Sequence, residues 1–130
     1  MDQTFEDYLK TADQARINRN LLLVEDALDV LCGKWKLRIL MAIVKGCSRY
    51  KDILDRNPGL TDKILSQNLR VLLEDCLIER EERAVGNLSR PQVEYRLTAH
   101  GRTLRPVIAL LARWGDEHRR YILGEKRCGT

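Results

Sequence analysis

The stretch Thr61-Asp-Lys-Ile-Leu-Ser-Gln-Asn-Leu-Arg-Val-Leu-Leu-Glu-Asp75 has the pattern of an amphipathic helix and follows a turn, Asn57-Pro58-Gly59. Thr61 is a suitable N-cap, because its hydroxyl can accept a hydrogen bond from an unpaired amide of the first turn. The apolar side of this helix recurs at helical spacing and consists of Leu65, Leu69, Leu72 and Leu73. The stretch therefore predicts a helix with one face buried in a core.

The opposite face of this helix carries polar side chains that can reach DNA bases or phosphates. They are Lys63, Ser66, Gln67 and Arg70. A helix face that only meets solvent is more often laced with acid–base pairs, whereas here the acids Glu74 and Asp75 stand at the far end. The pattern indicates a recognition helix, with an ordinary surface face as the alternative.

Size and composition limit the class of protein. A chain of 130 residues with 44% hydrophobic and 32% charged residues fits one globular domain, and its 5% aromatic content predicts an aliphatic core. No apolar run reaches the roughly 18 residues that span a bilayer, and the acidic start of the chain does not resemble a secretion signal. We therefore expect a cytoplasmic protein without a membrane partner, whose net charge of +4 permits a nucleic-acid partner.

The four cysteines, Cys32, Cys47, Cys76 and Cys128, are widely scattered and include no C-x-x-C pair. This spacing fits neither a disulfide framework nor a standard zinc site. We expect reduced thiols, some of them buried, and neither a metal nor another cofactor.

The segments before the turn form a series of helices. Residues 1–20 predict a short helix or an arm, residues 21–31 an amphipathic helix ended by Gly33, and residues 34–46 a helix central to the core. Ser48 is expected to cap a short helix whose inward residues are Tyr50, Ile53 and Leu54. Two helices joined by a tight turn with glycine, the second polar on its outer face, predict a helix-turn-helix.

A β-hairpin is predicted after Cys76. Residues 77–83 and 93–97 have strand character, and residues 84–92 between them contain turn residues. A hairpin bearing arginines directly after a recognition helix is typical of a wing. Arg83 and Arg90 could enter a minor groove or contact phosphate; a solvated loop is the alternative.

The C-terminal segment, capped by Thr98, carries an apolar stripe longer than a small domain can cover. Pro106 lies inside it, so we expect a kink or a late helix start there. Exposure of the whole stripe would exceed what monomers usually tolerate, so we predict a homodimer. Its predicted interface residues are Leu21, Val24, Ile108, Leu111, Trp114 and Tyr121. The predicted organisation is an N-terminal arm or helix (1–20), a winged helix-turn-helix domain with a dimerisation helix (21–124) and a tail (125–130).

Several segments together resemble the HxlR-type winged helix-turn-helix regulators, within the broader MarR-like group. In order they are Ala27-Leu-Asp-Val-Leu-Cys-Gly-Lys-Trp35, Pro58-Gly-Leu-Thr-Asp-Lys-Ile-Leu-Ser-Gln-Asn-Leu-Arg70, Leu72-Leu-Glu-Asp-Cys-Leu-Ile-Glu-Arg80, Val93-Glu-Tyr-Arg-Leu-Thr-Ala-His-Gly101, and Leu104-Arg-Pro-Val107 with Trp114-Gly115. The resemblance implies a mainly α fold with a small β-hairpin. It also implies a homodimer on an inverted-repeat operator, with the N- and C-terminal helices at the dimer interface.

The sequence departs from this pattern at its thiols and its wing. Relatives that sense oxidants or electrophiles carry a cysteine at the position of Leu22, whereas Cys32 and Cys76 stand where relatives most often have glycine. Together with Cys47, these two remain candidates for a redox role, although buried thiols are inert. The wing tip is slightly longer and less rich in proline than usual.

We assign candidate DNA contacts by side-chain chemistry. Gln67 is suited to pair with adenine, Arg70 or Lys63 to contact guanine or phosphate, and Ser66 and Thr61 to anchor phosphate at the helix N-terminus. Arg49 and Lys51 on the preceding helix are expected to hold backbone phosphate.

We predict no enzymatic activity and no catalytic residue. The two histidines, His100 and His118, have no accompanying catalytic motif, and a packing role fits His118 better. The predicted function is a sequence-specific, DNA-binding transcriptional regulator. The alternatives are a protein–protein interaction module without DNA binding, and a regulator that senses oxidants or electrophiles through its thiols.

Overall fold

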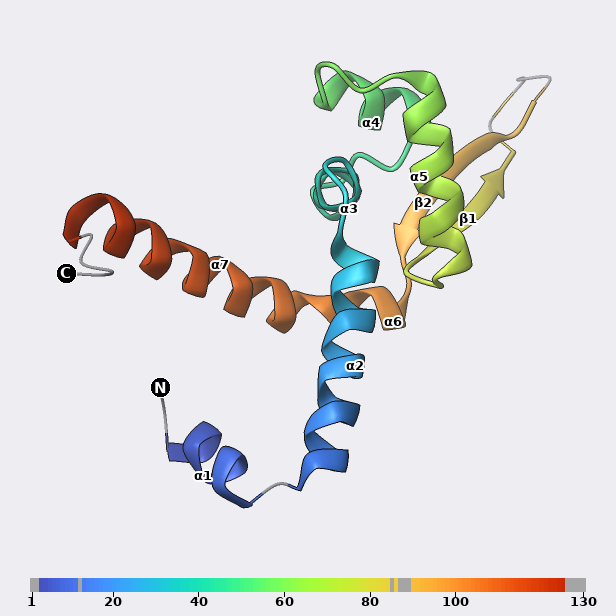
Figure 1. Ribbon diagram of the computed structural model, residues 1–130. Helices are drawn as coiled ribbons and strands as arrows, with labels where there is room; N and C mark the ends of the chain where they lie inside the picture. The colour runs from blue at the N-terminus through green and yellow to red at the C-terminus, as the bar shows by residue number, and fades with distance from the viewer. Residues whose placement is uncertain (1–2, 12, 85, 87–89, 126–130) are drawn as a thin grey trace.

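We describe the fold from a computed structural model, which describes residues 3–11, 13–84, 86 and 90–125. Its elements run in the order α1 (Gln3–Thr11), α2 (Gln14–Leu31), α3 (Lys36–Val44), α4 (Tyr50–Arg56), α5 (Asp62–Glu74), β1 (Ile78–Arg83), β2 (Gln92–Leu97), α6 (Ala99–Arg102), α7 (Leu104–Arg120) and a final π-helical turn (Tyr121–Glu125). The predicted class, mainly helical with one small hairpin, is confirmed (Figure 1).

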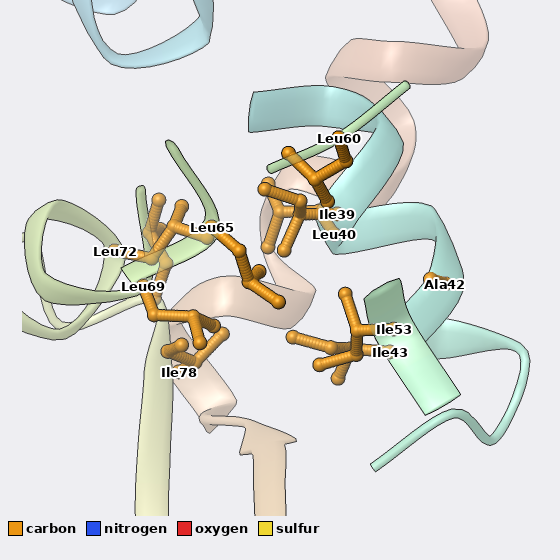
Figure 2. Packing of buried hydrophobic residues seen from close by; sticks show 11 residues of the cluster. Ile39, Leu40, Ala42, Ile43, Ile53, Leu60, Leu65, Leu69, Leu72 and Ile78 are labelled. Atoms are coloured by element: carbon orange, nitrogen blue, oxygen red, sulfur yellow. The ribbon is translucent and has the colours of Figure 1, made fainter. Parts of the chain in front are cut away.

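The core lies where α3, α4, α5 and the hairpin meet, and side chains from these elements point toward one another (Figure 2). Ile39 from α3, Ile53 from α4 and Leu65 from α5 are fully buried. Leu69 and Leu72 of α5 are buried as predicted, and Leu73 is partly buried against the same cluster. The apolar side of α5 therefore positions its polar side outward.

A tight turn joins α4 to α5. The side chain of buried Asn57 donates a hydrogen bond to the carbonyl of Ile53 at 2.8 Å, and the amide of Leu60 donates to the carbonyl of Asn57 at 3.0 Å. Gly59 has a φ of +93°, a conformation that side chains other than glycine rarely adopt. A Cβ at Gly59 would lie 3.7 Å from the ring of Trp35, so this turn packs directly on the residue before α3.

The hairpin pairs β1 with β2 in antiparallel register, from Ile78 opposite Leu97 to Arg83 opposite Gln92. The amide of Tyr95 in β2 also donates to the carbonyl of Ser48 at 2.7 Å. The segment before α4 is thereby fixed to the hairpin. The prediction that Ser48 caps α4 is wrong. The N-cap residue is Arg49, and no side chain caps this helix end.

Two helices extend away from this domain in different directions, and we call them the two arms: α2 and α7 (Figure 1). α7 has no buried residue at all. α2 exposes Leu21 by 57% and Val24 by 53%, and its only buried residue is Leu31 at the domain end. The arms therefore present apolar surface that the described part of the chain leaves uncovered.

The boundaries of both arms differ from the predicted ones. α2 begins at Gln14 rather than at residue 21, because the Asp13 carboxylate caps it by accepting a hydrogen bond from the Arg16 amide at 2.8 Å. Thr98 caps only the short α6, where it accepts from the Gly101 amide at 2.8 Å. α7 starts separately at Leu104, in agreement with the late helix start expected near Pro106. Proline is tolerated in the first turn, because the amides there have no hydrogen-bond partner within the helix.

Candidate nucleic-acid interface

The polar face of α5 is open to solvent along its length. Thr61 caps the helix as predicted, accepting a hydrogen bond from the Ile64 amide at 3.2 Å. Lys63, Gln67 and Arg70 are exposed, and their side chains make no hydrogen bond or ion pair with any residue that the structure describes. Three unpaired hydrogen-bonding groups on one helix face can serve a ligand outside the chain.

Tyr50 links α4 to the first turns of α5. Its hydroxyl lies 3.0 Å from both the carbonyl oxygen and Oδ1 of Asp62, and 3.2 Å from Oγ of Ser66. Burial raises the pKa of Tyr50 above its ordinary value, and the hydrogen bond to the Asp62 carboxylate raises it further against the lowering effect of Ser66. The Ser66 hydroxyl is thus already engaged within the chain, although the residue is exposed.

Arg49 connects the helices to the hairpin. Its guanidinium donates a hydrogen bond to Oε1 of Gln92, the first residue of β2, at 2.7 Å. Lys51, two residues further on, is exposed. The predicted phosphate contacts at the start of α4 therefore lie beside the hairpin, where Arg49 bonds to the loop end of β2 and also fixes the hairpin's position.

The hairpin is less basic than the sequence prediction assumed. Arg83 lies 3.4 Å from Glu81 and 3.5 Å from Glu94, and Arg96 lies 2.9 Å from Glu81. Acidic side chains on both strands therefore neutralise the positive charges of Arg83 and Arg96. Arg90 is exposed and has no partner among the described residues, while the predicted tip at 85 and 87–89 falls outside them.

A further group of cations flanks the turn between α4 and α5, and the sequence prediction missed it. The Nζ of Lys34 lies 4.8 Å from the ring centroid of Trp35, and the guanidinium carbon of Arg38 lies 5.9 Å from it. Both residues are exposed beside the ring that packs on Gly59. In the sequence, the Gly-Lys-Trp segment served only to identify the family resemblance. The placing of Lys34 and Arg38 on either side of Trp35 was the signal that could have indicated this group of cations.

The expectation that some thiols are buried is wrong for the three cysteines that the structure describes. Cys32 and Cys76 are exposed, Cys47 is half-buried, and all three are free. Cys32 is the C-cap of α2 and Cys76 follows the C-cap of α5, and helix ends of this kind lie at the surface. The predicted redox candidates are therefore accessible, and Cys128 lies outside the described residues.

Metal binding and membrane insertion are two further possibilities for the described ranges. No group of three or more His, Cys, Asp or Glu residues there could hold a metal ion. None of the helices there has the length and apolar character required to cross a membrane.

A helix-turn-helix whose second helix exposes a polar face, followed by an antiparallel hairpin, defines the winged helix-turn-helix class. A family model described as HxlR-like helix-turn-helix matches residues 30–122. The chain belongs to this family of HTH-type transcriptional regulators, which are not enzymes.

Individual relatives agree with this assignment. The HTH-type transcriptional regulator YtcD of Bacillus subtilis (strain 168), itself uncharacterized, is 37% identical over 102 residues, or 78% of this chain and 79% of YtcD. A crystal structure of ytcD has a TM-score of 0.64 at 39% identity and covers 75% of this chain and 97% of that chain. The redox regulator HypR in its reduced form has a TM-score of 0.63 at 33% identity, covering 76% and 95%.

Proposed function

We propose that this protein is a sequence-specific DNA-binding regulator that acts in the cytoplasm as a homodimer on an inverted-repeat operator. The observation that carries the proposal is the open face of α5, where Lys63, Gln67 and Arg70 lack partners among the described residues. An α-helix fits the major groove of B-form DNA, and these side chains match the donors and acceptors that base edges display there.

The contacts divide into reading and anchoring. Gln67 has the chemistry to pair with adenine, and Arg70 or Lys63 with guanine or phosphate. Thr61 stands at the N-terminus of α5, where the helix dipole favours a phosphate. Lys51 and Arg90 would hold phosphates on either side, and Arg49 would do so with the guanidinium N–H groups that its bond to Gln92 leaves free. Ser66 and Arg83 keep weaker roles, because both already interact within the chain.

A homodimer is supported by the apolar surface of the two arms. Trp114 is 63% exposed and stacks on His118 with ring centroids 4.8 Å apart, and Leu111, Tyr121 and Ile122 extend the same stripe. Leu21, Val24 and Leu28 on α2 are also more than half exposed. Burial of such surface against a second copy would place two recognition helices about one DNA turn apart, as a palindromic operator requires.

The division between reading and anchoring is tested by two substitutions. Gln67→Ala should lower affinity for the operator and leave affinity for random duplex nearly unchanged, since a good bidentate base contact contributes about 1–3 kcal/mol of discrimination. Arg90→Ala should weaken binding to both DNAs alike and reduce the slope of log affinity against log salt by about 1. Operator fragments selected from genomic DNA, titrated across salt concentrations, supply the measurement.

Arg113→Ala is the matched control, because Arg113 lies on α7, away from the proposed DNA-binding surface. It should leave the affinities for operator and for random duplex unchanged. Identical behaviour of the Gln67 and Arg90 variants would refute the division. Absence of any salt-dependent DNA binding by the wild type would favour the alternative, an interaction module that keeps the fold.

A second candidate function is regulation by thiol oxidation, and the exposure of Cys32 and Cys76 favours it. In that case two thiols join as a disulfide, and the two electrons and two protons pass to an oxidant such as diamide. Operator affinity measured before and after diamide should then change by at least about tenfold in the wild type, a shift of roughly 1.4 kcal/mol. Cys32→Ser and Cys76→Ser, singly and together, identify the responsible thiol; an unchanged affinity excludes the role.

A further inference from the structure

A basic groove of about 330 Å³ lies between α3 and the end of α4, and we call it the α3–α4 groove. Its apolar lining comes from Leu37, Met41 and Ala42 of α3. Three cationic side chains border this apolar lining, namely Arg38, Lys45 and Arg56, and all three are exposed. The groove therefore combines an apolar floor with a positively charged rim.

None of these three cations has an acidic partner in the part of the chain that the structure describes. Arg38 contacts only an aromatic ring, and Nη1 of Arg56 lies 3.8 Å from the sulfur of Cys47. Asp52 and Asp55 border an adjoining hollow together with Arg56, but no ion pair joins either carboxylate to it. Unpaired cations around an apolar floor suit an occupant that is both acidic and partly apolar.

A buried amide adds an unused acceptor to the groove. Asn57 contributes to the lining and is only 8% exposed. Its Nδ2 donates to the carbonyl of Ile53 at 2.8 Å, whereas its Oδ1 accepts from no residue that the structure describes. Buried polar atoms usually have a hydrogen-bond partner. A peptide N–H group of an occupant would supply one.

The spacing of the cations along α3 matches an extended peptide. Lys45 follows Arg38 by two helical turns, or about 10.5 Å along the axis, and Met41 lies between them on the same side. In an extended chain, acids four residues apart face the same side and span roughly 13 Å. Flexible arginine and lysine side chains bridge the remaining difference of about 3 Å. The groove therefore fits an extended segment with the pattern acid–x–apolar–x–acid.

The groove lies apart from the polar face of α5 and from both arms. In Figure 1 the turn after α4 lies at the left of the domain, whereas α5 and the hairpin lie at the right. The described lining of the groove includes no residue of α5, the hairpin, α2 or α7. An occupant of the groove thus leaves the proposed surfaces for DNA and for the dimer free.

We propose that the α3–α4 groove docks an extended acidic segment of another protein, in which two carboxylates flank one apolar side chain. The carboxylates pair with Arg38 and Lys45, and a peptide amide donates to Oδ1 of Asn57. The apolar side chain lies on Leu37 and Met41. This docking is separate from the proposed operator binding and does not require it.

The probe is the peptide Asp-Glu-Thr-Leu-Thr-Glu-Asp with blocked ends, titrated into the isotope-labelled full chain and followed by NMR chemical shifts. We expect saturable binding with a dissociation constant of about 1 mM or tighter and shift changes in α3 and at the end of α4. A peptide with Asn and Gln in place of the acids should bind at least about tenfold more weakly. A peptide with Gly in place of Leu should bind about fivefold more weakly, because a partly buried leucine is lost.

A double substitution in the groove tests the location. Arg38→Gln combined with Lys45→Gln should weaken binding of the acidic peptide at least about tenfold. The matched control removes two cations from α7, Arg113→Gln combined with Arg119→Gln, and should bind the peptide like the wild type. All four side chains are exposed, so both double variants should fold.

The proposal is overturned if the acidic peptide fails to bind saturably, if its neutral counterpart binds equally well, or if the shift changes map to α5 instead of the groove. Random duplex DNA is then titrated into both double variants. Weaker DNA binding by the groove variant than by the α7 variant would assign these cations to a nucleic-acid interface, which also overturns the proposal. The peptide titration contains no DNA, so its result is independent of the proposed operator binding.

Discussion

Cys76 has a φ of +60°, in the left-handed region where a side chain costs roughly 1–2 kcal/mol relative to glycine. The Leu77 amide donates to the carbonyl of Leu72 at 3.0 Å, and the Cys76 amide donates to that of Leu73 at 3.0 Å. This pair of bonds is the Schellman motif that ends many helices, usually with glycine at this position. The thiol therefore stands at a strained backbone position on the surface.

We predict that Cys76→Gly raises the free energy of unfolding by roughly 0.5–1 kcal/mol, the strain relieved less the added flexibility of glycine in the unfolded chain. Urea denaturation provides the measurement. Cys32→Gly is the control, because Cys32 has an ordinary φ of −73° and should gain nothing from glycine. Equal effects of the two substitutions would contradict the strain argument.

Gly101, in contrast to Cys76, is a position where a side chain would collide with neighbouring backbone. A Cβ there would lie 2.1 Å from the carbonyl oxygen of Leu77, and that backbone is held by a hydrogen bond from the Thr98 amide at 3.1 Å. Gly101→Ala should lower the free energy of unfolding by about 3 kcal/mol, because α6 and the backbone just before β1 must separate.

The comparison for Gly101 is Gly115→Ala, since a Cβ at Gly115 meets nothing within 4 Å. Within α7 this change should stabilise the protein by up to about 1 kcal/mol, the difference in helix propensity. Thermal and urea unfolding of both variants distinguish close packing from helix propensity. A Gly101→Ala protein as stable as the wild type would show that the contact relaxes at little cost.

At the scale of elements, Tyr50 holds α4 against the N-terminal turns of α5. Tyr50→Phe removes the hydroxyl that meets Asp62 and Ser66, and we predict a loss of about 1 kcal/mol in the free energy of unfolding. Because the folded pKa is raised, the neutral hydroxyl contributes fully below the ordinary tyrosine pKa of about 10, and its contribution is lost as the pH rises through the raised value.

The difference in stability between wild type and Tyr50→Phe should therefore be constant near neutral pH and shrink above about pH 10. A difference that grows in alkali would mean that the ionised hydroxyl, rather than the neutral one, is stabilised by the fold.

The hairpin is positioned by neighbouring elements rather than by its own two strands. An isolated hairpin is marginally stable, but here the Ser48 carbonyl and the Arg49 guanidinium both bind β2, at 2.7 Å each. The strands of the proposed wing are thus fixed relative to α4 and α5, which gives the proposed DNA-binding surface one rigid geometry.

At the scale of the whole molecule, the exposed apolar surface of the two arms supports the proposed homodimer. Trp114→Asp would place a charge in the middle of the apolar stripe, and we predict that it converts the proposed homodimer to a monomer in analytical ultracentrifugation. Affinity for an operator with two half-sites should fall at least about a hundredfold, because the gain from simultaneous engagement is lost. Affinity for a single half-site should change little.

Arg113→Glu, next to Trp114 but on another side of α7, also introduces an acidic side chain; it is the control and should leave the proposed dimer intact. A wild type that sediments as a monomer would refute the assembly, as would a Trp114→Asp variant that remains dimeric. Either result would leave the monomeric fold untouched, since α7 contributes no buried residue to it.

The local pattern of the sequence determined most of the domain. Helical spacing of leucines identified α5 and its polar face, Thr61 identified its cap, and strict alternation identified β2. These features depend on the chain's own periodicity and on hydrogen bonds between neighbouring residues, so they can be predicted without knowledge of the fold. The family resemblance, carried by the same segments, was also confirmed.

Contacts between distant residues were decided only by the tertiary structure. The engagement of Ser66 by Tyr50, the compensation of Arg83 by Glu94 and the link from Arg49 to Gln92 join elements whose relative placement no local pattern specifies. The exposure of Cys32 and Cys76, and the groove beside Arg38 and Lys45, likewise follow from how helices end and pack. Periodicity fixes which face of an element is apolar, but only packing in three dimensions decides which polar groups already have partners and which remain free to bind.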